Sequence, residues 1–388
     1  MEAVGLVHGT APNIGGEAAD TWRGAARFEV DRLVSFTETV LSALGLPPVQ
    51  AKVGAEALIL ADIRGVDSHG IARLPFYAER LQLGLVDPGA ELTIVRETPA
   101  TLALDANNGF GLTMATAAME RCIAKAEATG LCLTTVRRSN HFGIAGGYAL
   151  MAARRGLGGL AMTNTAALVV PMFGLHAAVG TNPLAFAVPT GRGDAPPLVL
   201  DMSTSAVAWG KIEVARRSGA EIPLGWAVDE TGTATTDPWA ARWLTPLGGD
   251  RATGGQKGYG LGVVVDVLCG PLAGAAWSAH IDSARGLERS ANLGHAFLAW
   301  RIDAFRDPEE FFADVAVMLA ELRATTPAPG HEATGVLAPG DPEIATEAIN
   351  RVEGVPVKPA VITELRALAA RVGVPFALEE DHGSGGVS

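Results

Sequence analysis

The chain has 388 residues, which exceeds the size at which one compact core usually stops growing, so we expect two domains. Hydrophobic residues make up 48% of the sequence and glycine occurs 47 times, a composition typical of a globular α/β protein with many tight turns. The formal net charge of −12 argues against nucleic acid and anionic membranes as partners, because both require clustered lysine and arginine.

The N-terminal part of the chain predicts a flexible segment followed by helices. Residues 1–24 are rich in glycine and alanine and lack periodicity, so we expect a flexible leader. Between Phe28 and Ile63 apolar residues recur at helical spacing with one break, which predicts two helices. The second helix leads into RGVDSHGIAR, residues 64–73, and RLPFYAERLQLGLV predicts a third helix.

The middle of the chain changes to shorter, strand-like apolar runs. We expect strands at residues 91–98, 100–106, 132–139, 157–166, 183–190 and 197–205, with helices at 111–130 and 146–156 and a buried helix at 257–274. Two charged amphipathic helices are expected after Asp307, and residues 379–388 predict a flexible tail.

Helices at both ends therefore enclose a strand-rich middle. The sequence predicts a discontinuous helical domain, residues 25–90 and 308–378, and a strand-rich domain, residues 91–307. The fold class that follows is α/β of the α+β kind.

Cysteine usage and apolar runs predict a cytoplasmic protein. No signal peptide is recognisable, and the longest apolar stretch is interrupted by Asp266 and Pro271, which favours a buried helix over a membrane span. Cys122, Cys132 and Cys269 lie far apart without metal-ligand spacing, as expected for buried thiols in a reducing compartment. We therefore expect no metal site.

The usual dinucleotide fingerprint is missing. GFGLTM, residues 109–114, lies between a predicted strand and a helix, but Met114 occupies the position of the third glycine. A P-loop is also absent. A dinucleotide that binds this chain must use another architecture.

Two histidines lie in polar, glycine-rich surroundings, His69 in DSHG and His141 in SNHFG. Each follows the end of a predicted element, where a side chain can face a cleft. Imidazole titrates near neutrality, which suits it to take the proton of a substrate alcohol. Asp67 and Ser68 could orient the His69 ring or form a simple helix C-terminal turn, and the residues alone leave both interpretations open.

Three further segments suggest contacts to a ligand. Arg73 follows His69 by four residues, so in a helix the two would share a face and could hold a carboxylate, although a surface arginine fits equally. VLDMSTS places Asp201 and three hydroxyl groups just after a strand, where they could bind ribose, orient a histidine or form a turn. GGQKGYG places Lys257 at a glycine-rich helix start, a plausible phosphate cradle.

Eight segments, in order, resemble the malate/L-lactate dehydrogenase family of NAD(P)-dependent 2-hydroxyacid oxidoreductases, which does not use a Rossmann fold. They include ADIRGVDSHGIARLPFYAERL, SNHFGIAGGYALMAARRGLGGLAMTNT, GTNPLAFAVP, LDMSTSAVAWGKI and QKGYGLGVVVDVL. The resemblance extends from Phe28 to Pro375. Within the family, WAVDETGTATTDP, NLGHAFL and ELRATTPAPG look most like ureidoglycolate dehydrogenase.

The resemblance implies an L-sulfolactate dehydrogenase-like fold, in which a non-Rossmann NAD(P)-binding domain has a largely antiparallel sheet. It implies NAD or NADP as cofactor and a homodimer with the active site near the subunit interface. It also implies that the proton is transferred either by His141 or by a relay of Ser68, His69 and Asp201. Arg73 matches the carboxylate-binding arginine of the family. Positions that match cofactor contacts are His141, Phe142, Gly143, Asn164, Asp201, Met202, Ser203, Lys257, Gly258 and Gly340.

The expected reaction is hydride transfer between NAD(P) and C2 of a small 2-hydroxy or 2-oxo acid. The alternative enzyme is a reductase of cyclic ketimine 2-carboxylates such as piperideine- or pyrroline-2-carboxylate. Family members with that activity tend to have a small residue where this chain has Tyr259, which favours the hydroxy acid. Ureidoglycolate is a third candidate substrate. A non-catalytic cofactor-binding protein is the alternative from another class, and the retained histidines and Arg73 argue against it.

Overall fold

The computed structural model describes residues 24–193, 195–282 and 289–378. Except for Gly24, the predicted leader lies outside these ranges, as does the predicted tail. Within them, no helix combines the length and the apolar character needed to cross a bilayer. The three cysteines are buried and unpaired, as predicted.

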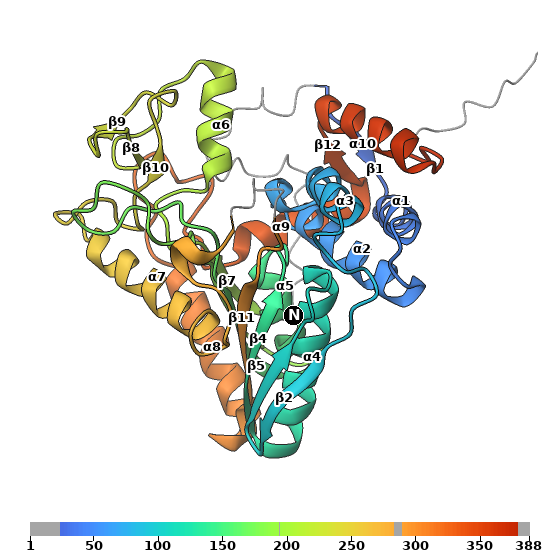
Figure 1. The fold of residues 1–388 in the computed structure, drawn as a ribbon. Helices are drawn as coiled ribbons and strands as arrows, with labels where there is room; N and C mark the ends of the chain where they lie inside the picture. Colours follow the sequence, from blue (N-terminus) through green and yellow to red (C-terminus); the bar gives the residue numbers. More distant parts are fainter. Residues whose placement is uncertain (1–23, 194, 283–288, 379–388) are drawn as a thin grey trace, which may run out of the picture.

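A seven-stranded sheet forms the centre of the molecule, in the order β2-β3-β4-β11-β5-β6-β7 (Figure 1). Its strands are β2 (Thr93–Thr98), β3 (Thr101–Asp105), β4 (Leu131–Ser139), β5 (Leu157–Thr163), β6 (Leu184–Val188), β7 (Leu198–Met202) and β11 (Leu293–Arg301). Neighbouring strands are antiparallel except β3 and β4, which flank helix α4 in a βαβ unit. The fold is therefore mixed α/β with a mostly antiparallel sheet, as predicted.

The central strand β11 was not among the predicted strands. It pairs with β4 on one side and β5 on the other, so residues remote in sequence meet along it. Its first five residues are all buried, including the polar His295. A strand buried on both faces shows no alternation of apolar and polar residues, which is the signal that identifies half-buried strands.

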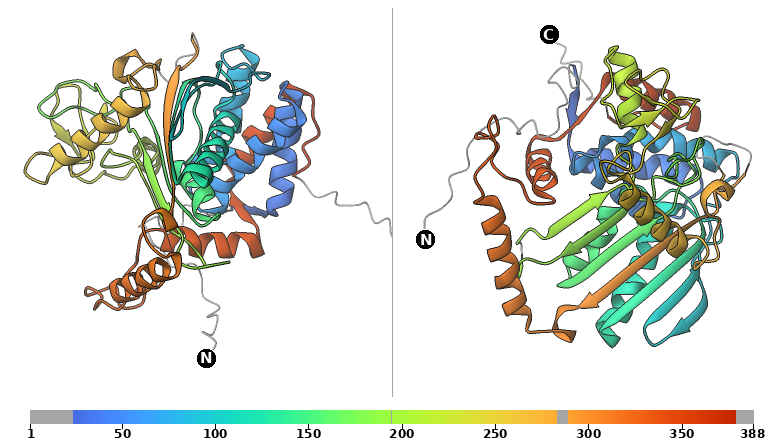
Figure 2. Two further views of the ribbon diagram at one scale, coloured as in Figure 1. Left: turned by 90° about the horizontal axis from the view of Figure 1, so that it is seen from below. Right: turned by 90° about the vertical axis from the view of Figure 1, so that its left-hand side faces the viewer.

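Helices cover both faces of the sheet (Figure 2, left). One face packs against α4 (Gly111–Thr129) and α5 (Ala145–Ala153) in the largest apolar cluster, and the other packs against α7 (Gly255–Cys269). The prediction that α7 is buried is wrong. The sheet covers only one side of this helix, the side that carries Val265, whereas Val264 and Val267 are about half exposed.

A second apolar core joins the helices near the two ends of the described chain. It contains α1 (Val30–Ala43), α2 (Pro48–Ile63), α3 (Leu74–Gln82) and α10 (Pro359–Val372), with the small sheet of β1 (Ala26–Phe28) and β12 (Val355–Val357). Phe110 and Leu112, at the start of α4, insert into this core. The helical core is thereby packed against the end of the sheet at which α4 begins.

The remaining elements lie at the edges. Helix α8 (Pro308–Arg323) packs near Leu198 of β7 (Figure 2, right), and α9 (Asp341–Glu353) contacts α2. The domain division proposed from the sequence remains a prediction, but α8 contacts the sheet edge. A small lobe contains the unpredicted α6 (Trp209–Ser218), β8 (Ala227–Val228), β9 (Ala234–Thr235) and β10 (Trp243–Leu244).

Candidate active site

The segment RGVDSHGIAR is a rigid double turn after α2. It contains two 3₁₀ turns, Asp67–His69 and Ile71–Arg73, divided by Gly70. The buried carboxylate of Asp62 accepts a 2.6 Å hydrogen bond from the backbone N–H of Ile71. A Cβ at Gly70 would overlap this carboxylate, so only glycine fits there. This packing places the side chains of His69 and Arg73.

Arg73 does not share a continuous helical face with His69, as one interpretation of the sequence required. Instead its guanidinium Nε donates a 2.9 Å hydrogen bond to the Ser68 carbonyl, which folds it back over the turn. Its guanidinium carbon also lies 5.8 Å from the centre of the Phe76 ring. These two contacts, and not a shared helical face, hold the Arg73 cation beside His69.

The second histidine lies in the loop between β4 and α5. The start of α4 supports this loop so closely that a Cβ at Gly111 would overlap the carbonyl oxygens of Asn140 and His141. The Asn140 side-chain amide donates to the carbonyl of Gly109 at 2.9 Å. These contacts fix the backbone that carries His141.

The rings of His69 and His141 stack, with centroids 5.5 Å apart and planes 23° apart. Nδ1 of His69 lies 2.9 Å from the Ser68 hydroxyl, and Nδ1 of His141 lies 2.7 Å from the hydroxyl of Tyr77 on α3. The Ser68 hydroxyl can donate or accept, so Nδ1 of His69 keeps a partner in either tautomer. Nδ1 of His141 also lies 3.4 Å from the backbone N–H of Gly143, which can only donate to it. The Nε2 atoms are therefore the ones left for a substrate.

Tyr77 is the site residue that sequence reasoning missed. It is buried and lies edge-on to Phe110, so it reads as an ordinary apolar position of helix α3. The available signal was its hydroxyl, because a buried tyrosine usually binds a polar partner.

Both imidazoles are held in the neutral form. Burial lowers the pKa of His69 to about 4, and the nearby Arg73 cation adds to the effect. Burial also holds the pKa of His141 well below its ordinary value, with further contributions from His69 and Arg73. Each ring is nevertheless partly exposed to solvent. Strongly perturbed pKa values of this kind mark His69 and His141 as candidates for a functional site.

Asp201 lies on β7, an edge strand of the seven-stranded sheet. Its Oδ2 accepts a 2.7 Å hydrogen bond from the backbone N–H of Gly146 in the first turn of α5. Burial raises the pKa of this carboxyl to about 6 even though the residue is exposed to solvent. Among the described residues, the Ser68–His69 contact of the expected relay is present, but no hydrogen bond joins His69 to Asp201.

Four other expected cofactor positions differ in exposure. Met202 and Ser203 follow Asp201 and are half-buried. Gly340 has a φ of +91° and lies so close to β7 that a Cβ would be 2.7 Å from the Val199 carbonyl oxygen. Lys257 is exposed on the first turn of α7.

The remaining expected cofactor positions are used in packing. Gly258 allows α7 to approach the Leu247 backbone, and Gly143 adopts a φ of +78° before α5. The ring of Phe142 is buried against His295 at 4.6 Å.

Asn164 is fully buried, and its amide bonds only to protein groups. Its Nδ2 donates to Asp266 at 3.1 Å and to the Ala276 carbonyl at 2.8 Å, while its Oδ1 accepts from the N–H of Gly294 at 3.0 Å. Within this chain the Asn164 side chain therefore has a structural role, and a contact of this position with the cofactor stays a prediction.

The groups present fit a nicotinamide dinucleotide. Such a ligand carries phosphates, ribose hydroxyls and a carboxamide, which need cations and hydrogen-bond acceptors. Lys257 has no ion pair within the described ranges, and the buried oxygens Oδ1 of Asn140 and Oε1 of Gln256 have no partner there. A carboxamide or hydroxyl donor would satisfy acceptors of this kind.

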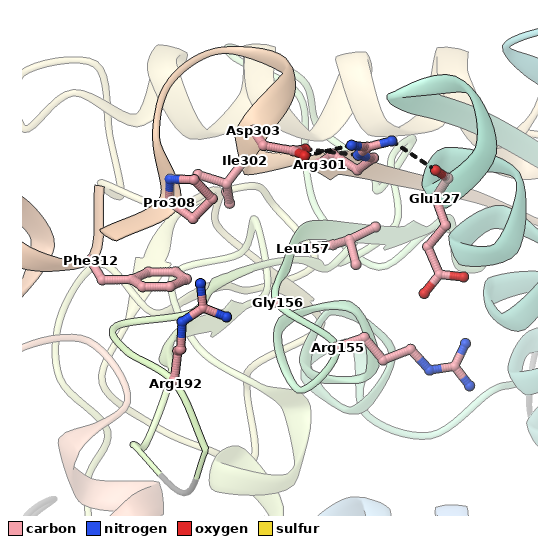
Figure 3. A pocket seen from close by; sticks show the side chains of 10 residues that line it. All are labelled: Glu127, Arg155, Gly156, Leu157, Arg192, Arg301, Ile302, Asp303, Pro308 and Phe312. Carbon is pink, nitrogen blue, oxygen red and sulfur yellow. Dashed lines mark hydrogen bonds and ion pairs between the residues drawn. The ribbon is translucent and has the colours of Figure 1, made fainter. Parts of the chain in front are cut away.

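One cavity, of about 310 Å³, contains none of the expected site residues (Figure 3). Three arginines line it, and each is ion-paired: Arg155 with Glu120, Arg192 with Glu309 and Arg301 with Asp303. Because these carboxylates neutralise the three arginines, none of the three is left to bind an anion in this cavity. In the described part of the chain, no group of three or more His, Cys, Asp or Glu side chains could hold a metal ion.

Comparison with known proteins accounts for this arrangement. Residues 28–366 match the family model described as malate/L-lactate dehydrogenase. The chain belongs to this family. It is an oxidoreductase of the dehydrogenase type, with relatives named as NAD(+)- and NADP(+)-dependent enzymes.

Individual relatives cover almost the whole chain. The malate dehydrogenase of Pyrococcus abyssi is 41% identical over 352 residues, 90% of this chain and 95% of its own. The sulfolactate dehydrogenase structure from Methanocaldococcus jannaschii superposes with a TM-score of 0.82 at 33% identity, covering 90% and 98% of the two chains. The expected sulfolactate dehydrogenase-like fold is confirmed.

The motif likeness to ureidoglycolate dehydrogenase does not extend to overall identity. The Escherichia coli ureidoglycolate dehydrogenase is 36% identical over 328 residues, 84% of this chain and 91% of its own, less than the malate dehydrogenase.

Proposed function

We propose that this enzyme transfers hydride between NAD(P) and C2 of a small 2-hydroxy or 2-oxo acid of the malate, lactate, sulfolactate or ureidoglycolate kind. The observation that carries the proposal is the stacked pair of neutral imidazoles, His69 and His141, with the Arg73 guanidinium beside them. An arginine suits a carboxylate, and a neutral imidazole suits the adjacent alcohol.

The chain's own residues bind the substrate and move its proton. Arg73 anchors the carboxylate, for which a guanidinium provides paired donors. Nε2 of His69 or His141 then exchanges a proton with the substrate oxygen, because each Nδ1 is bound to a hydroxyl. Tyr77 holds the His141 ring in place for this exchange.

The bound cofactor supplies the hydride-carrying carbon of its nicotinamide ring. We assign its phosphates to Lys257 and the first turn of α7, and its ribose hydroxyls to Asp201 and Ser203, with Met202 and the Gly340 turn alongside. Both NAD- and NADP-named relatives occur, so the proposal includes either cofactor. We also propose a homodimer with the site near the subunit interface, to be tested by light scattering on the purified protein.

The decisive experiment is a panel of 2-oxo acids and cyclic ketimine 2-carboxylates with NADH and NADPH, followed at the absorbance band of the reduced nicotinamide. Turnover of oxaloacetate, pyruvate or sulfopyruvate supports the proposal. Turnover of cyclic imines alone would make the protein a ketimine reductase. Cofactor binding without any turnover would indicate a non-catalytic binding protein.

A further inference from the structure

We propose that His295 is a positioning residue for His141, acting through Ser139 and Phe142. This inference rests on the proposed function, because it concerns how the proton-transferring histidine is held. His295 lies on the central strand β11 and is completely buried. The proposed reaction uses no residue of β11 directly.

His295 contacts the His141 segment on both sides. Its Nε2 lies 2.7 Å from the hydroxyl of Ser139, two residues before His141. Its ring stacks on Phe142, the residue after His141, with centroids 4.6 Å apart and planes 15° apart. The His295 side chain therefore fixes the backbone of His141 from both sides, by a hydrogen bond to Ser139 and a ring stack on Phe142.

The hydrogen-bond directions around His295 can be deduced. The Thr163 hydroxyl donates its proton to a backbone carbonyl, that of Gly294 at 3.0 Å or that of Asn164 at 3.1 Å. It must then accept from Nδ1–H of His295, which lies 2.8 Å away. Nε2 is left as the acceptor of the Ser139 hydroxyl.

This arrangement is stable at working pH. Burial lowers the pKa of His295 to about 3, so the ring stays neutral and keeps one donor and one acceptor. The hydrogen bonds continue beyond His295. The Thr163 hydroxyl donates to the carbonyl of Gly294, and the N–H of Gly294 donates to Oδ1 of Asn164. Asn164 is in turn bound to Asp266 of α7. The His141 loop is thus tied across β4, β11 and β5 to the helix that carries Lys257.

A proton-relay role for His295 fits the geometry less well. Its two ring nitrogens bind Ser139 and Thr163, whereas Nδ1 of His141 binds Tyr77. His295 therefore acts on His141 through position and not through proton transfer. Displacements of about 1 Å at a reacting group can cost about 100-fold in rate, so such support has a measurable effect.

The test uses Ser139→Ala, His295→Phe and the double variant of the full-length protein. His295→Phe retains a ring beside Phe142 and removes both hydrogen bonds. We expect each single variant to lower kcat about 10- to 100-fold while the Kd for NADH stays within about twofold. The double variant should be little worse than the more damaged single variant, because both changes break the same contact.

Thr134→Val is the matched control. Thr134 is a buried hydroxyl residue of the same strand as Ser139, and its hydroxyl lies by the Cys132 sulfur instead of the histidine. This variant should keep kcat within about twofold. Thermal unfolding of all variants separates lost positioning from lost folding, and if His295→Phe does not fold, Ser139→Ala alone decides the matter.

A cofactor-free measurement makes the inference independent of the proposed function. In ¹⁵N-histidine NMR spectra of the protein without cofactor, Ser139→Ala should shift the imidazole signals of both His295 and His141. An unchanged His141 signal, or full turnover by folded Ser139→Ala protein, would overturn the inference. Absence of turnover in the unmodified enzyme would instead count against the proposed function, with the NMR result still decisive for His295.

Discussion

The imidazole rings of His69 and His141 stack 5.5 Å apart although they belong to different parts of the fold. His69 follows α2 of the helical core, whereas His141 follows β4 of the sheet. The site therefore forms where the two cores meet, close to the point at which Phe110 and Leu112 enter the helical core. Substitutions on either side should impair the same chemistry.

Removal of either imidazole should reduce turnover. We expect His69→Ala and His141→Ala to lower kcat about 100- to 10,000-fold, the usual contribution of a general acid or base. Steady-state kinetics with the best 2-oxo acid measure the effect, and His331→Ala, an exposed histidine, serves as the control. The residue whose loss has the larger effect on kcat transfers the proton, and full turnover by both variants would refute the assignment.

Neutralising Arg73 should weaken substrate binding. Arg73→Gln removes the cation proposed to bind the carboxylate, a charged hydrogen bond worth about 1.5–3 kcal/mol. We expect kcat/KM for the 2-oxo acid to fall about 10- to 100-fold with the Kd for the cofactor unchanged. Arg192→Gln is the control, because Arg192 is 75% exposed and paired with Glu309. Equal losses in both variants would indicate a general charge effect.

Loss of the Tyr77 hydroxyl should disturb His141 specifically. Tyr77→Phe keeps the buried ring and removes the 2.7 Å hydrogen bond to Nδ1. We expect kcat to fall roughly tenfold, in line with one neutral hydrogen bond. The KM for the 2-oxo acid should change little, and the acid limb of the pH profile should move because Nδ1 loses its hydroxyl partner and keeps only the longer contact with the Gly143 N–H. An unaltered profile together with unaltered kcat would show that Tyr77 only fills space.

The depressed histidine pKa values predict an unusual pH dependence. A base must be neutral to accept the alcohol proton, and a lowered pKa extends the neutral form to lower pH. With the pKa of His69 about 4, kcat/KM for oxidation should remain level from neutral pH down to about pH 5 and decline below that. An inflection near 6.5 would instead reveal an unperturbed histidine. Arg73→Gln should shift the acid limb upward, because its cation contributes to the low pKa values.

Much of the secondary structure follows from local sequence. The helices of the helical core and most strands of the sheet lie where periodic or short apolar runs predict them. Strand β11 and the one-sided burial of α7 were not predicted, since both depend on which elements pack against them. Periodicity reports the exposure of a segment but not its neighbours.

The sequence by itself determined the family and the mostly antiparallel fold, and it predicted His69, His141 and Arg73 as site residues, because these are carried by short segments whose order in the chain is readable. Only the tertiary structure decided that Tyr77 binds His141, that His295 supports its loop and that Asn164 is fully enclosed. Each of these contacts joins residues far apart in the chain. Their formation depends on how two apolar cores pack together, which no local pattern encodes.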